Sequence, residues 1–501
     1  MIIKKPFVIG AIILASANII TRLLGFAYRI FMSNSIGASG MGLYQLIMPI
    51  YSLAWAISCS GITTSLSRLV ASENAQNNKK NIKILLKISL ILTIGISLFL
   101  SIILFIFADY IGNNILNDER ATLPLKVLSF SLVFMAAGSC IRGYFLGLQK
   151  NLTPAISQIL EQFIRMGIIF IFATQFAERG AEYAVYIAVI GIVFGEGISF
   201  AYVFISLKLN IKKLIIIPKM PVLNNKQALF ALISISAPLT LNRISGSFLS
   251  TIENLLIPNR LQAYGLSQND AIEIFGKITG MALPLIFFPS AILTALSISL
   301  IPSISEAISI NNFKKIDNVI SKSIEFTLIA AFGAAIIFTV FPYEIGRIVY
   351  NQNLESMLII LSIICPFWYI NITLSGILNG LGEQMFIFKN SLFASVLTIG
   401  FIYFLVPIYG IYSFLAGWFI SLIIVTFLDI KKIKKKTNIN ISFLKHFVKP
   451  LLAASASGLV VNYIHNNYIS QIFSLVASVS ISLSMLAGLY LGFIFLLLKF
   501  K

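Results

Sequence analysis

The chain has 501 residues, of which 58% are hydrophobic and 11% charged, whereas about 25% of the residues of a typical soluble protein are charged. This composition excludes a soluble globular protein and predicts a membrane protein. The net charge of +19 is explained by membrane topology and by attraction to anionic lipid head groups, so we expect no nucleic-acid partner. Cys59, Cys140 and Cys365 are scattered, and no Cys or His cluster has metal-ligand spacing.

Apolar runs recur from end to end, and a helix needs about 20 such residues to cross the hydrocarbon. The runs are long and continuous, which favours helices over the alternating strands of a membrane barrel. We therefore expect an all-α polytopic membrane protein with about 14 transmembrane helices, near residues 6–33, 41–71, 84–108, 123–148, 154–176, 182–207, 228–255, 271–305, 320–342, 355–379, 387–406, 411–429, 447–466 and 471–498.

The first span carries two arginines, Arg22 and Arg29, within SANIITRLLGFAYRIFMSNSIGASGMG at 16–42. Their spacing returns both side chains to nearly the same face of a helix. A charge facing lipid costs several kcal/mol, so we expect this cationic stripe to face a cavity for an anion. The alternative is that both arginines snorkel to the membrane surfaces or pair with carboxylates and only fix the packing.

The distribution of the 37 Lys and Arg residues predicts the topology. With a cytoplasmic N-terminus, most lysines outside the spans lie on the inner side, including the run KKIKKK at 431–436, and the opposite side has only Arg120, Arg179, Arg260 and Arg347. This asymmetry places both termini in the cytoplasm. Ala15-Ser16-Ala17 resembles a signal cleavage site, but the apolar run continues beyond it, so we expect the first segment to be retained.

Matched landmarks indicate an internal duplication. Pro49 precedes a lysine pair at 79–80, and Pro284 precedes another at 314–315; RGYFLGLQK at 142–150 parallels SGILNGLGE at 375–383. This pattern fits the parallel repeats of some transporters. We expect a six-helix N-lobe at 1–209, a cytoplasmic linker at 210–227, a six-helix C-lobe at 228–430, and a basic loop with two further helices at 431–501.

Ionisable residues also occur inside other predicted spans. The first half has Arg142, Glu161, Arg165 and Glu196, and the second has Arg243, Glu253, Lys277 and Glu325. Glu161 and Arg165 are four residues apart on one helix, so we expect them to pair. With Arg22 and Arg29, cations outnumber carboxylates, and guanidinium groups bind phosphate in a bidentate manner. The interior therefore favours an anionic head group.

No phosphate-binding loop, catalytic triad or metal motif is present, so we expect neither an enzyme nor a bound cofactor. Transport would then depend on a Na⁺ or H⁺ gradient or on the membrane potential. With an inside-negative potential, outward movement of an anion is electrically downhill by about 2.3 kcal/mol per charge per 100 mV.

Three stretches resemble a known family: TRLLGFAYRIFMSNSIG at 21–37, IRGYFLGLQKNLTPAISQILEQFIR at 141–165 and GMALPLIFFPSAILTALSISLIPSISEA at 280–307. They are similar to the stage V sporulation protein B group of the multidrug/oligosaccharidyl-lipid/polysaccharide (MOP) exporter superfamily, which also includes the MurJ-type lipid II flippases. The resemblance implies a V-shaped pair of six-helix lobes. It also implies alternating-access flipping of an undecaprenyl-pyrophosphate-linked glycan, such as a peptidoglycan precursor for the spore cortex.

The resemblance also implies arginines in a central cavity. The S-R-x-L-G-F arginine of MurJ-type flippases falls on Arg22, in T-R-L-L-G-F, whereas their G-F-x-R arginine meets Tyr28, with Arg29 one residue later. A further arginine of those flippases has no counterpart near Leu53 and Ala54. The appended pair of helices would form a groove for the lipid tail.

Our leading prediction is a flippase in the bacterial cytoplasmic membrane whose partners are a lipid-linked glycan, membrane lipids and candidate cell-wall synthases. The head-group contacts would be Arg22, Arg29 and Arg243, with Arg142 and Lys277 as further candidates. One alternative is a cation-coupled drug exporter that uses the carboxylates Glu161, Glu196 and Glu253 for coupling. Another is a non-transporting scaffold for cell-wall enzymes.

Overall fold

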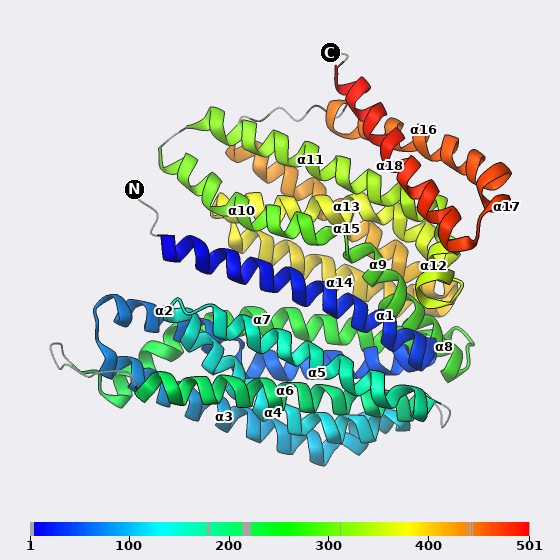
Figure 1. The fold of residues 1–501 in the computed structure, drawn as a ribbon. Coiled ribbons are helices and arrows are strands. Elements are labelled where there is room, and N and C mark those ends of the chain that lie inside the picture. The colour runs from blue at the N-terminus through cyan, green and yellow to red at the C-terminus, as the bar shows by residue number, and fades with distance from the viewer. Residues whose placement is uncertain are drawn as a thin grey trace. The chain divides into compact units, whose positions relative to one another are not determined.

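The computed structural model describes residues 5–177, 181–212, 222–310, 312–437, 439, 442 and 444–499. Every regular element in this part of the chain is helical. Two compact units are present: unit 1 is Met1–Asn259 with Ser267–Gly276, and unit 2 is Arg260–Leu266 with Lys277–Lys501. The expected all-α polytopic architecture is confirmed (Figure 1).

Thirteen helical stretches among the described residues are long and apolar enough to cross a membrane. One of them, Ile19–Ala75, has 57 residues and is too long for a single crossing, because a helix rises about 1.5 Å per residue across a core of about 30 Å. Helix α1 (Lys5–Trp55) is interrupted at Gly37, whose φ of 69° is not helical. Counting the two sides of Gly37 separately reconciles the thirteen stretches with the expected fourteen.

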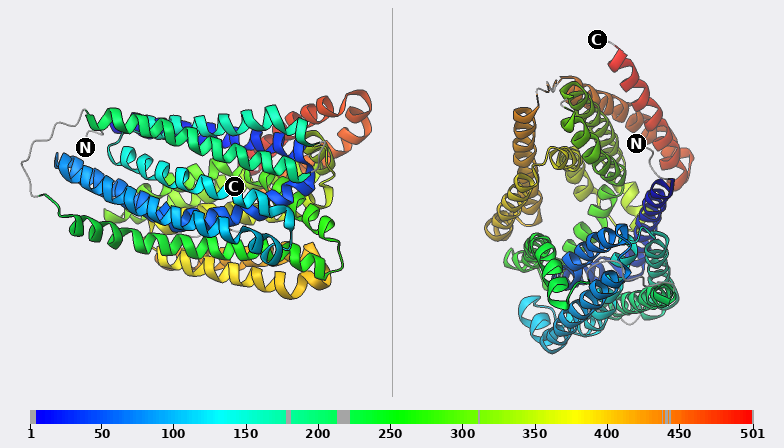
Figure 2. Two further views of the ribbon diagram at one scale, coloured as in Figure 1. Left: turned by 90° about the horizontal axis from the view of Figure 1, so that it is seen from below. Right: turned by 90° about the vertical axis from the view of Figure 1, so that its left-hand side faces the viewer.

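Unit 1 is built from long helices that run alongside one another (Figure 2). After α1, its elements are the π-helical turn η1 (Ala56–Ser60), α2 (Gly61–Ala75), α3 (Lys79–Tyr110), α4 (Thr122–Gly147), α5 (Leu152–Ala177), α6 (Ala181–Lys212), α7 (Asn225–Ala263) and α8 (Gln268–Phe275). A short 3-10 turn at Glu119–Ala121 follows the π-helical turn Ile111–Ile115.

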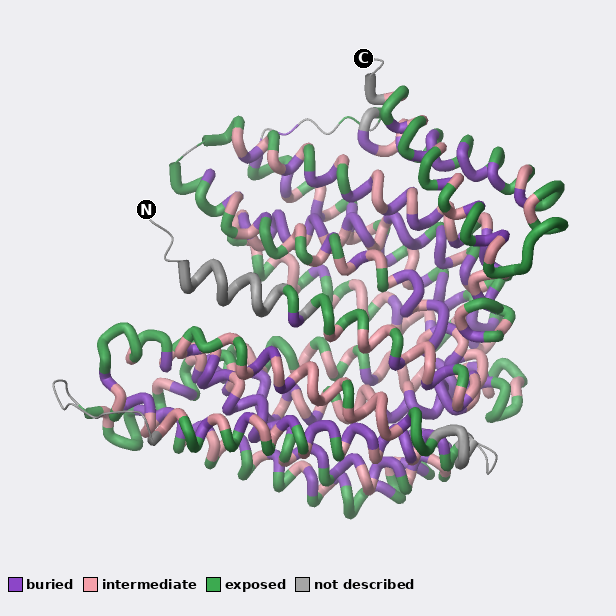
Figure 3. The backbone as a smooth tube through the Cα atoms, viewed as in Figure 1, coloured by how far each residue is buried: buried purple, intermediate pink, exposed green. Residues whose placement is uncertain are grey.

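The core of unit 1 joins α2, α3, α4, α6 and α7, and includes Leu66, Leu85, Tyr144, Val203 and Leu232. The outer face of α3 is equally apolar yet exposed: Phe99 and Ile106 each have 64% of their surface accessible. Buried and exposed residues alternate along the long helices (Figure 3). In a membrane-spanning helix, this pattern gives one face to protein and the other to lipid.

Most of α7 belongs to compact unit 1, whereas residues 228–255 are expected from the sequence to lie in the second lobe. Specific contacts account for this grouping. The Thr251 hydroxyl donates to the carbonyl of Pro49 in α1 at 3.3 Å. A Cβ on Gly61 would lie 2.5 Å from the carbonyl oxygen of Ser236, so the absence of a side chain lets α2 approach α7 closely.

The span expected near 271–305 is present, with a candidate stretch at Ser290–Ser309, but the region is not one regular helix. Instead, α8 continues into a π-helical stretch, η4 (Gly276–Ala282), then α9 (Leu283–Phe287), a break at residues 288–289, and α10 (Ser290–Ser309). Pro284 and Pro289 explain the irregularity, because proline has no backbone N–H and its ring clashes with the preceding turn.

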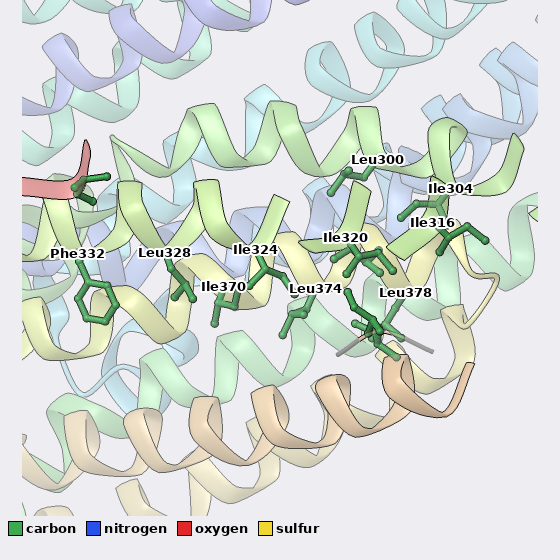
Figure 4. Close-up of a cluster of buried hydrophobic side chains, with 14 of the residues drawn as sticks. Leu300, Ile304, Ile316, Ile320, Ile324, Leu328, Phe332, Ile370, Leu374 and Leu378 are labelled. Carbon is green, nitrogen blue, oxygen red and sulfur yellow. The ribbon is translucent and has the colours of Figure 1, made fainter. Parts of the chain in front are cut away.

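Unit 2 continues with α11 (Phe313–Val340), α12 (Pro342–Tyr350), α13 (Glu355–Gly380), α14 (Gln384–Tyr409), α15 (Ile411–Lys436), α16 (Lys449–Ile464), α17 (Ser470–Ile472) and α18 (Leu475–Lys499). Two π-helical turns, Leu444–Val448 and His465–Ile469, precede α16 and α17. Its core forms where α10, α11 and α13 meet (Figure 4). Ile320, Ile324 and Leu328 follow one another at intervals of four residues on α11, toward Leu374 and Leu378 of α13.

The two C-terminal helices, which lie outside the predicted duplication, belong to the same core. Tyr490 and Ile494 of α18 and Ala453 of α16 join the cluster around α11. The Tyr490 hydroxyl donates to the Ile329 carbonyl of α11 at 2.8 Å. These helices are therefore an integral part of unit 2.

Candidate functional site

A polar cavity of about 460 Å³ lies within unit 1. Helices α1, α4, α5 and α6 supply its lining: Thr21, Tyr51, Ser52, Trp55, Met135, Ser139, Arg142, Gln158, Glu161, Gln162 and Glu196. Its volume lies within the range of about 300–1,000 Å³ that is typical of small-molecule sites. Ionisable side chains at membrane depth mark a functional site by default.

Beside this cavity, one guanidinium binds two carboxylates. Arg165 Nη2 lies 2.6 Å from Glu161 Oε1 on the same helix and 3.1 Å from Glu196 Oε1 on α6. The predicted Glu161–Arg165 pair is therefore confirmed, and Glu196 joins it from 31 residues away. A Cβ on Gly195 would lie 2.9 Å from Arg165 Cγ, so the absence of a side chain there lets α6 lie close to this pair.

Arg142 reaches the cavity from α4 and is held by hydroxyl groups. Its Nη2 donates to Ser139 Oγ at 2.9 Å and its Nη1 donates to Ser199 Oγ at 3.2 Å. Since Arg142 and Arg165 oppose Glu161 and Glu196, the formal charges around the cavity cancel. The positive excess expected for the whole interior does not extend to this site.

Three buried polar atoms near the cavity have no hydrogen-bond partner among the described residues: Tyr51 Oη, Arg165 Nε and Glu196 Oε2. Buried polar atoms are paired in the great majority of cases, because desolvation without a partner costs about 1–3 kcal/mol. Tyr51 and Glu196 both line the cavity, and Glu196 is only 5% exposed. The cavity lining itself, with amide, hydroxyl, guanidinium and carboxylate groups, suits an occupant that can both donate and accept hydrogen bonds.

Of the predicted site residues, the structure brings Arg142, Glu161 and Glu196 together at the cavity. Arg22 is exposed and Arg29 half-buried, and both precede the break at Gly37 in α1. In the part of the chain that the structure describes, neither makes an ion pair. Their assignment to an anionic head group stays a prediction.

The other predicted residues lie on different elements. The guanidinium of Arg243, an exposed residue of α7, lies 5.5 Å from the centre of the Trp55 ring, so it contacts a residue that lines the cavity. Glu253 is half-buried on α7, and Lys277 is half-buried in the π-helical stretch η4 of unit 2. None of these three residues lines the cavity.

Sequence reasoning overlooked the neutral side chains of the site, among them Tyr51, Trp55, Gln158 and Gln162. A signal for the two glutamines was present in QILEQFIR at 158–165. Residues at i, i+3, i+4 and i+7 of this stretch are Gln158, Glu161, Gln162 and Arg165, which share one helix face. A polar stripe of this kind inside an apolar span predicts a lining surface.

The fold and this intramembrane site define a multi-pass membrane protein with the fold of the MOP superfamily. One solved structure with this fold is an inward-facing multidrug resistance MATE family transporter, with a TM-score of 0.63 and 15% identity over 83% of this chain and 95% of that one. Another is the lipid II flippase MurJ in an inward closed conformation, with a TM-score of 0.66 and 16% identity over 96% of this chain and 98% of that one.

The model of the polysaccharide biosynthesis protein family matches residues 7–308, and the MatE model matches residues 278–404. The chain belongs to the polysaccharide biosynthesis protein family. Stage V sporulation protein B of Bacillus subtilis (strain 168) is 29% identical over 490 residues, which cover 96% of this chain and 92% of that protein.

Proposed function

We propose that this protein is a flippase that moves a polyprenyl-diphosphate-linked glycan from the inner to the outer leaflet by alternating access. The observation that carries the proposal is the charged and hydrogen-bonding cavity inside unit 1, in a chain that spans the membrane repeatedly. A transporter of an apolar substrate would not need these ionisable groups, which are costly to place inside a membrane. Similarity to stage V sporulation protein B and to the lipid II flippase MurJ over almost the whole chain supports the same class.

In this proposal the arginines bind the head group of the substrate. Arg22 and Arg29 of α1 and Arg243 of α7 contact the diphosphate, with Arg142 and Lys277 as further candidates. Guanidinium groups suit this role because their paired N–H donors match phosphate oxygens. Arg22 is exposed and has no ion pair among the described residues, so its guanidinium retains its donors for a ligand.

The setting of the proposal is a bacterial cytoplasmic membrane with both termini inside. The substrate would be an undecaprenyl-pyrophosphate glycan, either a lipid II-like precursor for the spore cortex or a polysaccharide repeat unit. The membrane potential, Na⁺ or H⁺ would drive the movement, and cell-wall synthases on the outer face would take the product.

The test is a flipping assay with purified protein in liposomes that contain a fluorescent polyprenyl-diphosphate-linked sugar. A membrane-impermeant glycosidase added outside measures how much substrate reaches the outer leaflet. We expect protein-dependent flipping of the lipid-linked sugar. The proposal would be overturned if the wild-type protein left every candidate lipid as protected from the glycosidase as it is in protein-free liposomes.

A second candidate is a cation-coupled drug exporter, which the match of residues 278–404 to the MatE model favours. Glu161, Glu196 and Glu253 would then be the coupling carboxylates. This alternative would be supported over the flippase if cells exported a dye in a manner that depends on an ion gradient. The Glu→Gln variants at these positions should then lose the efflux.

A further inference from the structure

The cavity of unit 1 does not have the charge of a diphosphate site. A diphosphate entering it would meet Glu161 and Glu196, and an organic cation would meet Arg142. The remaining guanidinium, on Arg165, is already engaged by both carboxylates. Like charges brought together in a medium of low dielectric repel strongly. The balance of charge therefore favours an uncharged polar ligand.

The uncharged lining groups have the chemistry that sugar hydroxyls require. Gln158 and Gln162 lie four residues apart on one face of α5, and each side-chain amide both donates and accepts. Ser52 and Ser139 add hydroxyl groups. Glu161 and Glu196 also line the cavity, and their carboxylate oxygens are hydrogen-bond acceptors.

Trp55 gives the cavity an aromatic wall. An indole ring offers a large, rigid and mostly apolar surface, which suits the C–H face of a pyranose ring. The same ring has the Arg243 guanidinium 5.5 Å from its centre. One side chain therefore connects the neutral cavity to an arginine proposed to contact the diphosphate.

We propose that this cavity is a subsite for the uncharged sugar of the lipid-linked glycan, separate from Arg22, Arg29 and Arg243, which contact its diphosphate. The inference rests on the proposed function and adds to it the part of the substrate that unit 1 recognises. Gln158 and Gln162 bind sugar hydroxyl or acetamido groups, and Trp55 packs against the ring.

The tryptophans of this chain allow a direct binding test. The chain has three tryptophans; Trp368 and Trp418 belong to unit 2, where both contact Phe287. In a W368F/W418F protein, Trp55 is the one remaining indole and reports on the cavity. We expect a saturable fluorescence change with N,N′-diacetylchitobiose, an uncharged disaccharide of N-acetylglucosamine. A saturable response to inorganic pyrophosphate or tetraphenylphosphonium, with none to the disaccharide, would overturn the inference.

Variants of the glutamines test the assignment of the contacts. In the same background, Q158L/Q162L should raise the apparent Kd for the disaccharide at least tenfold, because both amides are lost. Q384L is the matched control, since Gln384 is an exposed residue of unit 2. Gln158→Leu and Gln162→Leu are also made singly, so a double variant that fails to fold still leaves the contact tested. An unchanged Kd in the folded variants would refute the assignment.

A flipping assay separates this inference from the proposed function. The Q158L/Q162L protein should flip a polyprenyl-diphosphate-linked N-acetylglucosamine at least tenfold more slowly, yet flip the sugar-free polyprenyl diphosphate at the wild-type rate. Equal effects on both lipids would overturn the sugar subsite and leave the flippase standing. If the wild-type protein flips neither lipid, the proposed function fails, and a missing response to the disaccharide then overturns the inference as well.

Discussion

Glu196 of α6 lies with its Oε1 3.1 Å from Nη2 of Arg165 on α5, although 31 residues separate them in the chain. The same guanidinium nitrogen lies 2.6 Å from Glu161 Oε1. This arrangement fixes the relative position of two helices in unit 1 at the wall of the cavity. It also makes one cation the ion-pair partner of two carboxylates, of which Glu196 is buried and Glu161 is partly buried.

Replacing Arg165 with methionine should therefore destabilise the protein strongly. Removal of one partner from a buried ion pair costs about 3–5 kcal/mol, because the remaining charge stays desolvated. We expect a large fall in the melting temperature, measured in detergent by loss of the monodisperse peak in size-exclusion chromatography. Arg165→Lys keeps the positive charge but not the planar guanidinium, so its melting temperature should fall less. A wild-type melting temperature for Arg165→Met would show that the carboxylates do not depend on this cation.

Arg22 offers the opposite case, since it is exposed and makes no ion pair among the described residues. Arg22→Ala should abolish flipping of the lipid-linked glycan while expression and the melting temperature remain at wild-type levels. The matched control is Arg347→Ala, at an exposed position of α12 in unit 2, which should flip normally. Wild-type flipping by Arg22→Ala would remove this arginine from the proposed head-group contacts.

Gly376 marks a close approach of α13 to α10 in unit 2. A Cβ there would lie 2.6 Å from the carbonyl oxygen of Ser297, whereas a Cβ on Gly400 of α14 would meet nothing within 4 Å. Gly376→Ala should lower the free energy of unfolding by about 1–3 kcal/mol through overpacking. Gly400→Ala should leave it unchanged or raise it by about 0.5–1 kcal/mol. The melting temperatures of the two variants, measured side by side, test this difference. An equal fall in both melting temperatures would contradict the packing argument.

Glu383, in the turn between α13 and α14, provides a pH-dependent contact with α15. Its carboxylate oxygens lie 3.0 Å from Lys432 Nζ and 3.1 Å from Lys436 Nζ. Hydrogen bonds from these two lysines hold the pKa of Glu383 below its ordinary value of 4.5. The folded state therefore favours the charged carboxylate. This contribution is complete above the unfolded pKa and disappears as the pH falls through the folded pKa.

Comparison with Glu383→Gln tests this contact. At neutral pH the variant should melt at a slightly lower temperature than the wild type; the difference is small because solvent screens these partly exposed ion pairs. The difference should vanish at a pH below the folded pKa and should shrink in high salt. A difference that persists unchanged in acid would point to a cause other than the charge of Glu383.

The sequence by itself determined the class of fold and part of the site. Hydrophobicity summed over about 20 residues is a local property, so the apolar runs predicted the membrane-spanning helices well. The spacing of four residues between Glu161 and Arg165 fixed their pairing for the same reason, since a single helix brings them together. Both predictions depend only on backbone geometry within one segment.

Only the tertiary structure decided which segments meet. It brought Glu196 to Arg165 and Arg243 to Trp55, and it grouped α7 with unit 1. It also showed that three of the predicted site residues, Arg142, Glu161 and Glu196, line one cavity and that the other predicted site residues do not line it. Contacts of this kind depend on how each helix is rotated and how closely its glycines let it approach a neighbour. Periodicity along one helix carries no record of that rotation, because it is set by the packing of all the helices together.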